Sequence, residues 1–128
     1  MNRKIVSSLC GIMLLVATGG CATSLMRSEL YFGASRTNGP DVSQADWQSF
    51  VDDVITPRFP DGLTVLEGNG QWRMKDGSLA KEKSRIVILV HSNSAQDRKK
   101  LDEIRDAYKS RFAQEAVLEI DEKSDVRF

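Results

Sequence analysis

Apolar residues recur along the chain in two different periods, which predict four strands and two helices. The strand segments are rich in aromatic, β-branched and other apolar residues and are bounded by turn residues. They are Glu29 to Gly33, Leu63 to Met74, Leu79 to His91 and Ala116 to Ile120. Asp76-Gly77 separates the second strand from the third, and this dipeptide favours a tight two-residue hairpin turn.

Two other segments repeat their apolar residues three and four positions apart, as amphipathic helices do. The first begins at Ser43, which forms a variant capping box with Asp46, and Pro57 ends it. Ser94 and Asp97 begin the second helix in the same way. The apolar positions of the two helices are Trp47, Phe50, Val51, Val54 and Ile55, and Leu101, Ile104, Tyr108 and Phe112.

The order of these elements predicts an α+β fold, a ferredoxin-like βαββαβ sandwich with an antiparallel sheet and two helices on one face. Residues 86–90 are apolar at every position, which is typical of a strand buried on both sides. We therefore expect a cover over the second face. It would be a second copy of the chain in a homodimer, or flanking segments of the same chain. In a homodimer, a charge at Val87 or Leu89, whichever points away from the helices, would dissociate the copies.

The N-terminal residues have the pattern of a bacterial export signal. Arg3 and Lys4 precede an apolar run from Ile5 to Val16, and Gly19-Gly20 leads into Cys21. The stretch resembles a lipobox, whose cysteine is acylated and becomes the new N-terminus. We therefore expect lipidation at Cys21, by acyl chains such as palmitate, and membrane attachment through this lipid.

This pattern divides the chain into a lipoprotein signal peptide at 1–20, a lipidated cysteine with a short tether at 21–28, and a single α+β domain at 29–128. Ala22 resembles the sorting pattern for an outer membrane, so the domain would face the periplasm. Two alternatives remain open. Cleavage after Ala22 would release a soluble periplasmic protein, and a retained helix would span the membrane, although the apolar run is shorter than the about 20 residues that a span needs.

Charge and cysteine content narrow the range of partners and cofactors. Without Arg3 and Lys4 the chain has 16 basic and 18 acidic side chains, a net charge of −2, which gives no electrostatic reason to expect nucleic acid. Cys10 leaves with the signal peptide and Cys21 carries the lipid, so no thiol remains for a disulfide or a metal. We expect neither a metal nor another cofactor.

The sequence contains few residues of the types that form enzyme active sites. His91 is the one histidine, and with Ser92 or Ser94 and Asp97 it supplies the residue types of a catalytic triad. Triads are normally assembled from separate segments, whereas these residues are only a few positions apart. We interpret them as a polar strand end beside a helix cap, and predict no catalytic residue.

Several stretches resemble an uncharacterised family of small bacterial envelope proteins, catalogued as domain of unknown function 3574. The resemblance covers the chain from residue 29 to the C-terminus, and Pro57 to Gly62 is its most specific part. The other residues that carry it are Leu30 to Gly33, Thr56, Leu63 to Val65, Gly70 to Arg73, Glu82, Tyr108, Arg111-Phe112 and Gln114-Glu115. The resemblance implies a shared domain but no particular activity.

Polar and aromatic side chains within these stretches are the candidate contacts to a ligand or partner. They are Arg58, Gln71, Trp72, Arg73, Glu82 and Tyr108. A two-residue turn would place Arg73 opposite Ala80 and Gln71 opposite Glu82. Arg73 and Glu82 would then form a structural ion pair, or contribute to an anion or polar-ligand pocket flanked by Trp72 and Tyr31.

Together these patterns predict a lipid-anchored envelope domain that binds a protein or a small ligand at the periplasmic membrane surface without catalysis. The alternative is a small enzyme or ligand carrier of the dimeric α+β barrel type, using arginine, tyrosine and carboxylate side chains. A deep pocket that encloses Arg58 or Arg73 with Tyr108 would favour the enzyme, and a flat apolar patch would favour the binding module.

Overall fold

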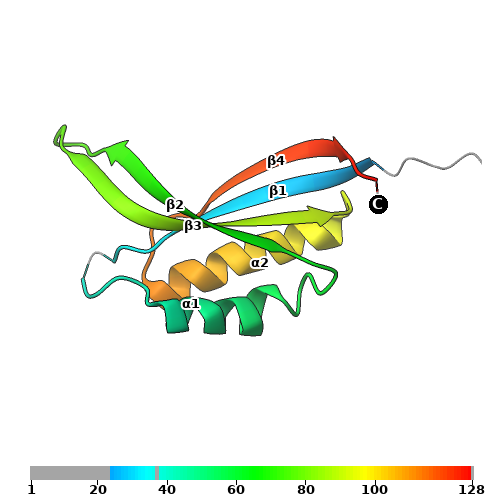
Figure 1. Cartoon of the computed structure of the whole chain (residues 1–128), viewed down its shortest axis with the longest axis horizontal. Helices are drawn as coiled ribbons and strands as arrows, with labels where there is room; N and C mark the ends of the chain where they lie inside the picture. Colours follow the sequence, from blue (N-terminus) through cyan, green and yellow to red (C-terminus); the bar gives the residue numbers. More distant parts are fainter. Residues whose placement is uncertain (1–23, 37, 128) are drawn as a thin grey trace, which may run out of the picture.

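The computed structural model describes residues 24–36 and 38–127 (Figure 1). The predicted signal peptide and the lipidation at Cys21 lie outside these described residues. The elements in chain order are β1 (Ser24–Gly33), α1 (Gln44–Phe50), the π-helical segment η1 (Val51–Ile55), β2 (Thr64–Arg73), β3 (Leu79–His91), α2 (Ala95–Phe112) and β4 (Leu118–Asp125).

The four strands form one antiparallel sheet in the order β2-β3-β1-β4. Both helices lie on the same side of this sheet, and within residues 24–36 and 38–127 the other side carries no helix (Figure 1). The predicted ferredoxin-like α+β fold is therefore confirmed. We call the side without helices the open face.

Strands β1 and β4 are longer than their hydrophobic patterns suggest. Residues 24–28 were predicted as a tether, but they belong to β1, where Ser24 pairs with Asp125 and Ser28 with Asp121. Both segments are too polar to be recognised alone. Each supplies the other's backbone hydrogen bonds, so pairing extends the two strands together.

The helix starts follow the predicted capping. The Ser43 hydroxyl accepts the Asp46 N–H at 3.1 Å, and the Ser94 hydroxyl accepts the Asp97 N–H at 3.1 Å. These bonds satisfy backbone donors that have no partner within a helix. Helix α1 continues into η1 before the chain turns away, and α2 ends at Ala113 in a left-handed conformation.

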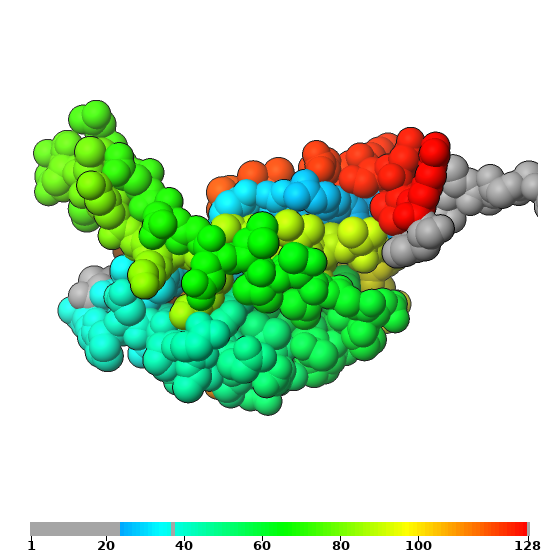
Figure 2. All heavy atoms as spheres, in the orientation of Figure 1, coloured from blue at the N-terminus to red at the C-terminus, as the bar shows by residue number. Residues whose placement is uncertain are grey.

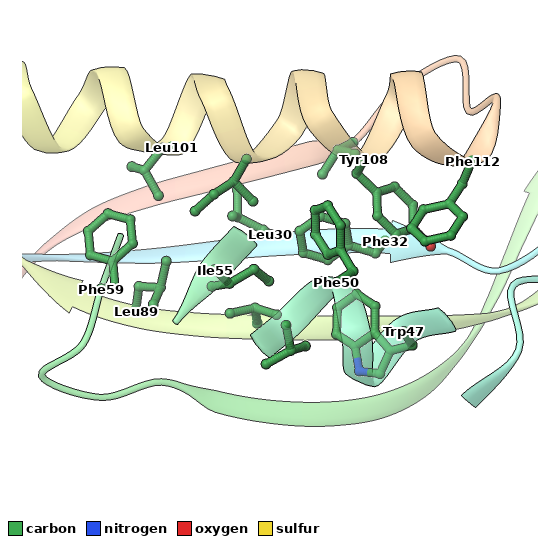
Figure 3. Packing of buried hydrophobic residues seen from close by; sticks show 14 of the residues in the cluster. Leu30, Phe32, Trp47, Phe50, Ile55, Phe59, Leu89, Leu101, Tyr108 and Phe112 are labelled. Carbon is green, nitrogen blue, oxygen red and sulfur yellow. The ribbon is translucent and has the colours of Figure 1, made fainter. Parts of the chain in front are cut away.

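An aromatic core fills the space between the sheet and the helices (Figure 3). The Phe32 ring lies 5.2 Å from the Trp47 ring and 4.7 Å from the Tyr108 ring, measured between centroids. The Tyr108 hydroxyl donates to the Gly33 carbonyl at 2.8 Å, which satisfies its buried polar end. The core therefore joins β1 to both helices.

The turn between β2 and β3 differs from the prediction. The Met74 N–H donates to Ser78 O at 2.8 Å, and the Gly77 N–H donates to Met74 O at 3.0 Å. Gly77 has a φ of +87°, a conformation that glycine adopts without strain. The loop therefore contains three residues, 75–77, as in a type I turn followed by a left-handed residue.

This longer loop shifts the register by one residue. Arg73 pairs with Leu79, and Glu82 pairs with Gly70. The predicted pairs Arg73–Ala80 and Gln71–Glu82 are therefore wrong. A shift of one residue also moves the side chains of one strand to the other face relative to those of its partner strand. Arg73 and Glu82 thus lie on opposite faces of the hairpin and cannot form the expected ion pair.

Candidate interaction surface

Strand β3 alternates between the core and the open face. Val87 and Leu89 are 0% and 1% exposed and belong to the core beneath the helices. Ile86, Ile88 and Val90 therefore point to the open face. The expectation that Val87 or Leu89 faces away from the helices is wrong, because both side chains are enclosed by the core.

Apolar side chains extend across all four strands on the open face. In the first row of paired residues, from β2 to β4, the members are Leu66, Ile86, Tyr31 and Leu118. In the next row they are Thr64, Ile88, Glu29 and Ile120. Because paired residues share a face, these two rows form a continuous apolar patch with one carboxylate in it.

The first residues of β4 place Leu118 and Ile120 on this patch and Glu119 and Asp121 on the helix side. Leu118 and Ile120 are 57% and 47% exposed. The intervening Glu119 accepts a hydrogen bond from Arg105 at 2.9 Å on the helix side. Burial raises the pKa of Glu119, and the negative charge of Asp121 adds to that rise. A strand at the edge of a sheet usually directs its apolar side chains to the core and its charged side chains to solvent, whereas Leu118, Glu119 and Ile120 do the opposite.

The charged groups near the start of β1 are paired with one another. Arg27 lies 2.5 Å from Glu29 and 2.8 Å from Glu122. The Tyr31 hydroxyl donates to Glu29 at 2.5 Å, and this bond is the main reason why the pKa of Tyr31 is raised. At this end of the open face, one cation is therefore shared by two carboxylates, which leaves an excess of negative charge.

The outer half of the β2–β3 hairpin, residues 69–83, extends beyond the helices and curves away from them (Figure 1). We call it the hairpin arm. Trp72 and Glu82 lie on the side of the arm that continues the open face. The Glu82 carboxylate packs on Gly33, where an added Cβ would lie 2.6 Å from Oε1, and it accepts the Ser35 N–H at 3.3 Å. Burial raises the pKa of Glu82.

The other predicted contact residues lie elsewhere. Gln71 and Arg73 are on the opposite side of the arm from Trp72. Arg58 donates to Glu103 at 3.1 Å and to the Val54 carbonyl at 2.9 Å, so it ties η1 to α2. Tyr108 is a core residue, and burial raises its pKa to about 12. The six residues therefore do not form one site, and only Trp72 and Glu82 share a surface.

A polar hollow lies between the arm and the start of α1. Its lining residues are Gln44, Glu67, Gly68, Asn69, Lys83, Ser84 and Arg85. The Arg85 guanidinium donates to the Val42 carbonyl and to Gln44, both at 3.3 Å, and its carbon lies 5.3 Å from the centre of the Trp47 ring. The hollow does not include Arg58, Arg73 or Tyr108, the residues of the pocket expected for an enzyme.

His91 contacts a residue of the neighbouring strand β1 and the adjacent backbone, not Ser94 or Asp97. Its Nε2 lies 2.7 Å from Ser28 Oγ and its Nδ1 lies 2.7 Å from the Ser92 carbonyl. Ser28 also donates to Asp121, which links three neighbouring strands. Ser94 caps α2, as the interpretation of a strand end beside a helix cap predicts.

Two further observations concern only residues 24–36 and 38–127. No three histidine, cysteine or acidic side chains in this part come together in a group that could hold a metal ion. None of the helices in this part of the chain is both long enough and apolar enough to cross a membrane.

Sequence and structure comparisons identify the family of the chain and its fold. The model of a family described as "Protein of unknown function (DUF3574)" matches residues 27–128. The chain therefore belongs to this family, as its sequence resemblance indicates. No curated protein matches the chain.

Two solved structures are similar in fold. A phage SAM lyase in complex with S-methyl-5'-thioadenosine has a TM-score of 0.61 and 18% identity, over 81% of this chain and 84% of the lyase. CutA from Synechococcus elongatus has a TM-score of 0.53 and 9% identity, over 80% of this chain and 79% of CutA. At these identities the similarity establishes the fold alone.

Proposed function

We propose that this member of the DUF3574 family is a lipid-anchored envelope protein whose domain binds a partner protein through the open face of its sheet, without catalysis. The observation that carries the proposal is the apolar patch on that face. Of the large apolar side chains that are exposed in the described residues, those on the open face or its continuation along the arm are Leu66, Trp72, Val90, Leu118 and Ile120. A continuous apolar patch on a protein surface marks an interaction site.

The anchor in this proposal is Cys21, at the end of a lipobox-like segment. Only Ala22 and Thr23 separate it from the first residue of β1, and the three residue steps from Cys21 to Ser24 reach about 11 Å at most. The lipid would therefore hold the start of β1 close to the bilayer. The end of β3 lies at the same end of the sheet, because Met26 pairs with His91.

The hairpin arm would then point away from the membrane. Strand β3 has 13 residues between its end near the membrane and the turn, a length of at most about 40 Å. This orientation leaves the open face standing upright on the bilayer, accessible to another protein attached to the same surface.

Two polar residues of the enzyme alternative, Arg58 and Tyr108, already have structural partners, and so does His91. Arg58 bonds to Glu103, Tyr108 bonds to the Gly33 carbonyl, and His91 contacts Ser28. A side chain that holds two elements together is a poor candidate for chemistry that requires it to exchange partners during a reaction.

A small-molecule activity remains the second candidate because one specific feature favours it. The polar hollow beside Arg85 contains cationic, anionic and amide side chains that could hold a polar ligand. S-methyl-5'-thioadenosine, the ligand of the similar phage lyase, is a suitable probe. A saturable rise in the melting temperature that Arg85→Ala abolishes would support this candidate, and no rise at millimolar probe would exclude this ligand.

The anchor and its orientation can be tested with single cysteines in the full chain, because lipidation of Cys21 leaves no other thiol after processing. A fluorophore at Asn93→Cys should be quenched by headgroup-labelled lipids, while one at Lys75→Cys, in the hairpin turn, should be unaffected. Mass spectrometry of the wild-type N-terminus should find acylated Cys21. An unmodified N-terminus, or equal quenching at both positions, would contradict the proposal.

A further inference from the structure

We infer that the partner on the open face is a second copy of this chain, with the two sheets packed face to face. This inference rests on the proposed function and names its partner. Two sheets pack with their inner side chains interdigitated and their backbones about 10 Å apart. Rows of alternating β-branched, leucine and aromatic residues, such as Leu66-Ile86-Tyr31-Leu118, suit that packing.

The charges of the open face disfavour an anionic partner. Arg27 offsets the charge of only one of its two partners, Glu29 and Glu122, and Glu82 lies at the opposite end of the face. A membrane rich in anionic lipids or an acidic protein would favour a basic surface, whereas this face has more carboxylates than cations. Two identical faces can meet here because Arg27 and its carboxylates are already paired within each copy.

The size of the face suits a stable dimer. Four strands about 4.8 Å apart and about ten residues long give a face of roughly 600 Å² per copy. A typical stable interface buries about 800 Å² per partner. Stable interfaces begin at about 600 Å² per partner, so the open face, with the strands of the hairpin arm included, reaches the lower end of that range.

The hairpin arm itself favours a neighbour on this side. A two-stranded ribbon is at best marginally stable alone, and this one has no helix beneath its outer half. Figure 2 shows the arm standing above the level of β1 and β4, so that it flanks the open face on one side. Trp72 is 47% exposed on the arm and continues this face. A second sheet seated on the open face would bury Trp72 against the arm.

The anchor makes this geometry possible on one membrane. Both copies would be attached near the start of β1, so a two-fold axis perpendicular to the bilayer keeps both anchors on the same side. Sheets related by such an axis keep their strands roughly aligned, which is one of the two common modes of sheet packing. Attachment to one surface also raises the effective concentration of each copy for the other.

Cysteine cross-linking in intact cells tests this inference with the full chain. Single cysteines replace Leu66, Ile88 or Ile120 on the open face, and Lys99→Cys is the matched control on α2, where the lysine side chain is 78% exposed. Mild oxidation should convert at least one open-face variant into a species of twice the monomer mass. Lys99→Cys should remain monomeric.

A positive charge introduced on the open face should prevent the cross-linking. Adding Leu118→Lys to Ile88→Cys should lower the yield of the dimer at least tenfold, while adding Ser49→Lys on α1 should leave the yield unchanged. The inference is overturned if every open-face cysteine stays monomeric, or if each forms a species of another mass. Membrane fractionation of the same cells reports separately on the anchor, so loss of dimers with retained membrane attachment overturns only the self-association.

Discussion

The two faces of this sheet are made of alternate residues of the same strands, yet they differ in what covers them. On the helix side, Leu30 and Phe32 are fully buried beneath an aromatic core. On the open face, Tyr31 lies between them in sequence and sits in an apolar row that no helix covers. The buried residues on the helix side stabilise the fold of a single chain.

The apolar character of the open face has a different origin. Strand β4 places Glu119 and Asp121 towards the helices, where each requires a hydrogen-bonding partner, and leaves Leu118 and Ile120 in solvent. A monomer gains nothing from this arrangement, because the opposite polarity would bury the apolar pair and hydrate the charges. The comparison supports our proposal that one face serves the stability of the fold and the other serves association.

Removing a core aromatic should have the largest effect on stability. Phe32→Ala removes a ring that contacts Trp47 and Tyr108, and should lower the free energy of unfolding by about 3–5 kcal/mol. Tyr31→Ala, one residue away on the open face, should cost about 1 kcal/mol or less in the dissociated chain. Urea denaturation of both variants compares the two faces directly. Equal losses would contradict the division of roles.

Tyr108→Phe should have a smaller effect on the same side of the sheet. The change keeps the ring in the core but leaves the Gly33 carbonyl without its donor at 2.8 Å. We expect a loss of about 1–3 kcal/mol in the free energy of unfolding, the cost of a buried acceptor without a partner. Thermal unfolding with calorimetry measures it. No loss would mean that the hydroxyl does not anchor the end of β1 to α2.

Acid should weaken the helix layer through Asp97. Hydrogen bonds from Ser92 and Lys100 lower the pKa of Asp97 to about 2, below the value of about 4 in an unfolded chain. A lowered pKa stabilises the fold above pH 4, and this contribution disappears as the pH falls from about 4 through 2. Asp97→Asn should therefore lower the melting temperature at pH 6 and have little effect near pH 2. A difference that persists at pH 2 would contradict this origin.

A charge on the open face should have the smallest effect on the folded chain. Leu118→Lys places a cation where the native side chain is 57% exposed, so the stability of the dissociated chain should change by about 0.5 kcal/mol or less. Circular dichroism before and after heating measures the fold and its stability. A large loss would mean that Leu118 supports the fold of a single chain.

The sequence predicts the elements better than it predicts what their side chains face. Helical spacing at Trp47 and Phe50 and capping at Ser94 identify the helices, because these signals are local. The all-apolar segment 86–90 predicts a buried strand, but its composition does not show whether the side that contains Val87 or the opposite side faces the helices. That choice depends on where the helices pack, which is a tertiary property.

The predicted pairing of Arg73 with Glu82 depended on the length of the turn between β2 and β3. Asp76-Gly77 suggests a two-residue loop, whereas hydrogen bonds from Met74 and Gly77 close a three-residue loop. This difference moves Arg73 away from Glu82 and invalidates the predicted pair. The alternation of Leu118 and Ile120 with acidic residues was the available sign of an apolar outer face. It could be interpreted only after the register of β4 against β1 was known.

The number of chains in the native particle tests the role of the open face most directly. Multi-angle light scattering of the mature protein, extracted from membranes in detergent and corrected for bound detergent, gives this number. Wild-type protein should contain two chains, and the Ile86→Lys variant should contain one chain with an unchanged circular dichroism spectrum. A wild-type protein that contains one chain at every concentration would contradict the assignment of the open face to self-association.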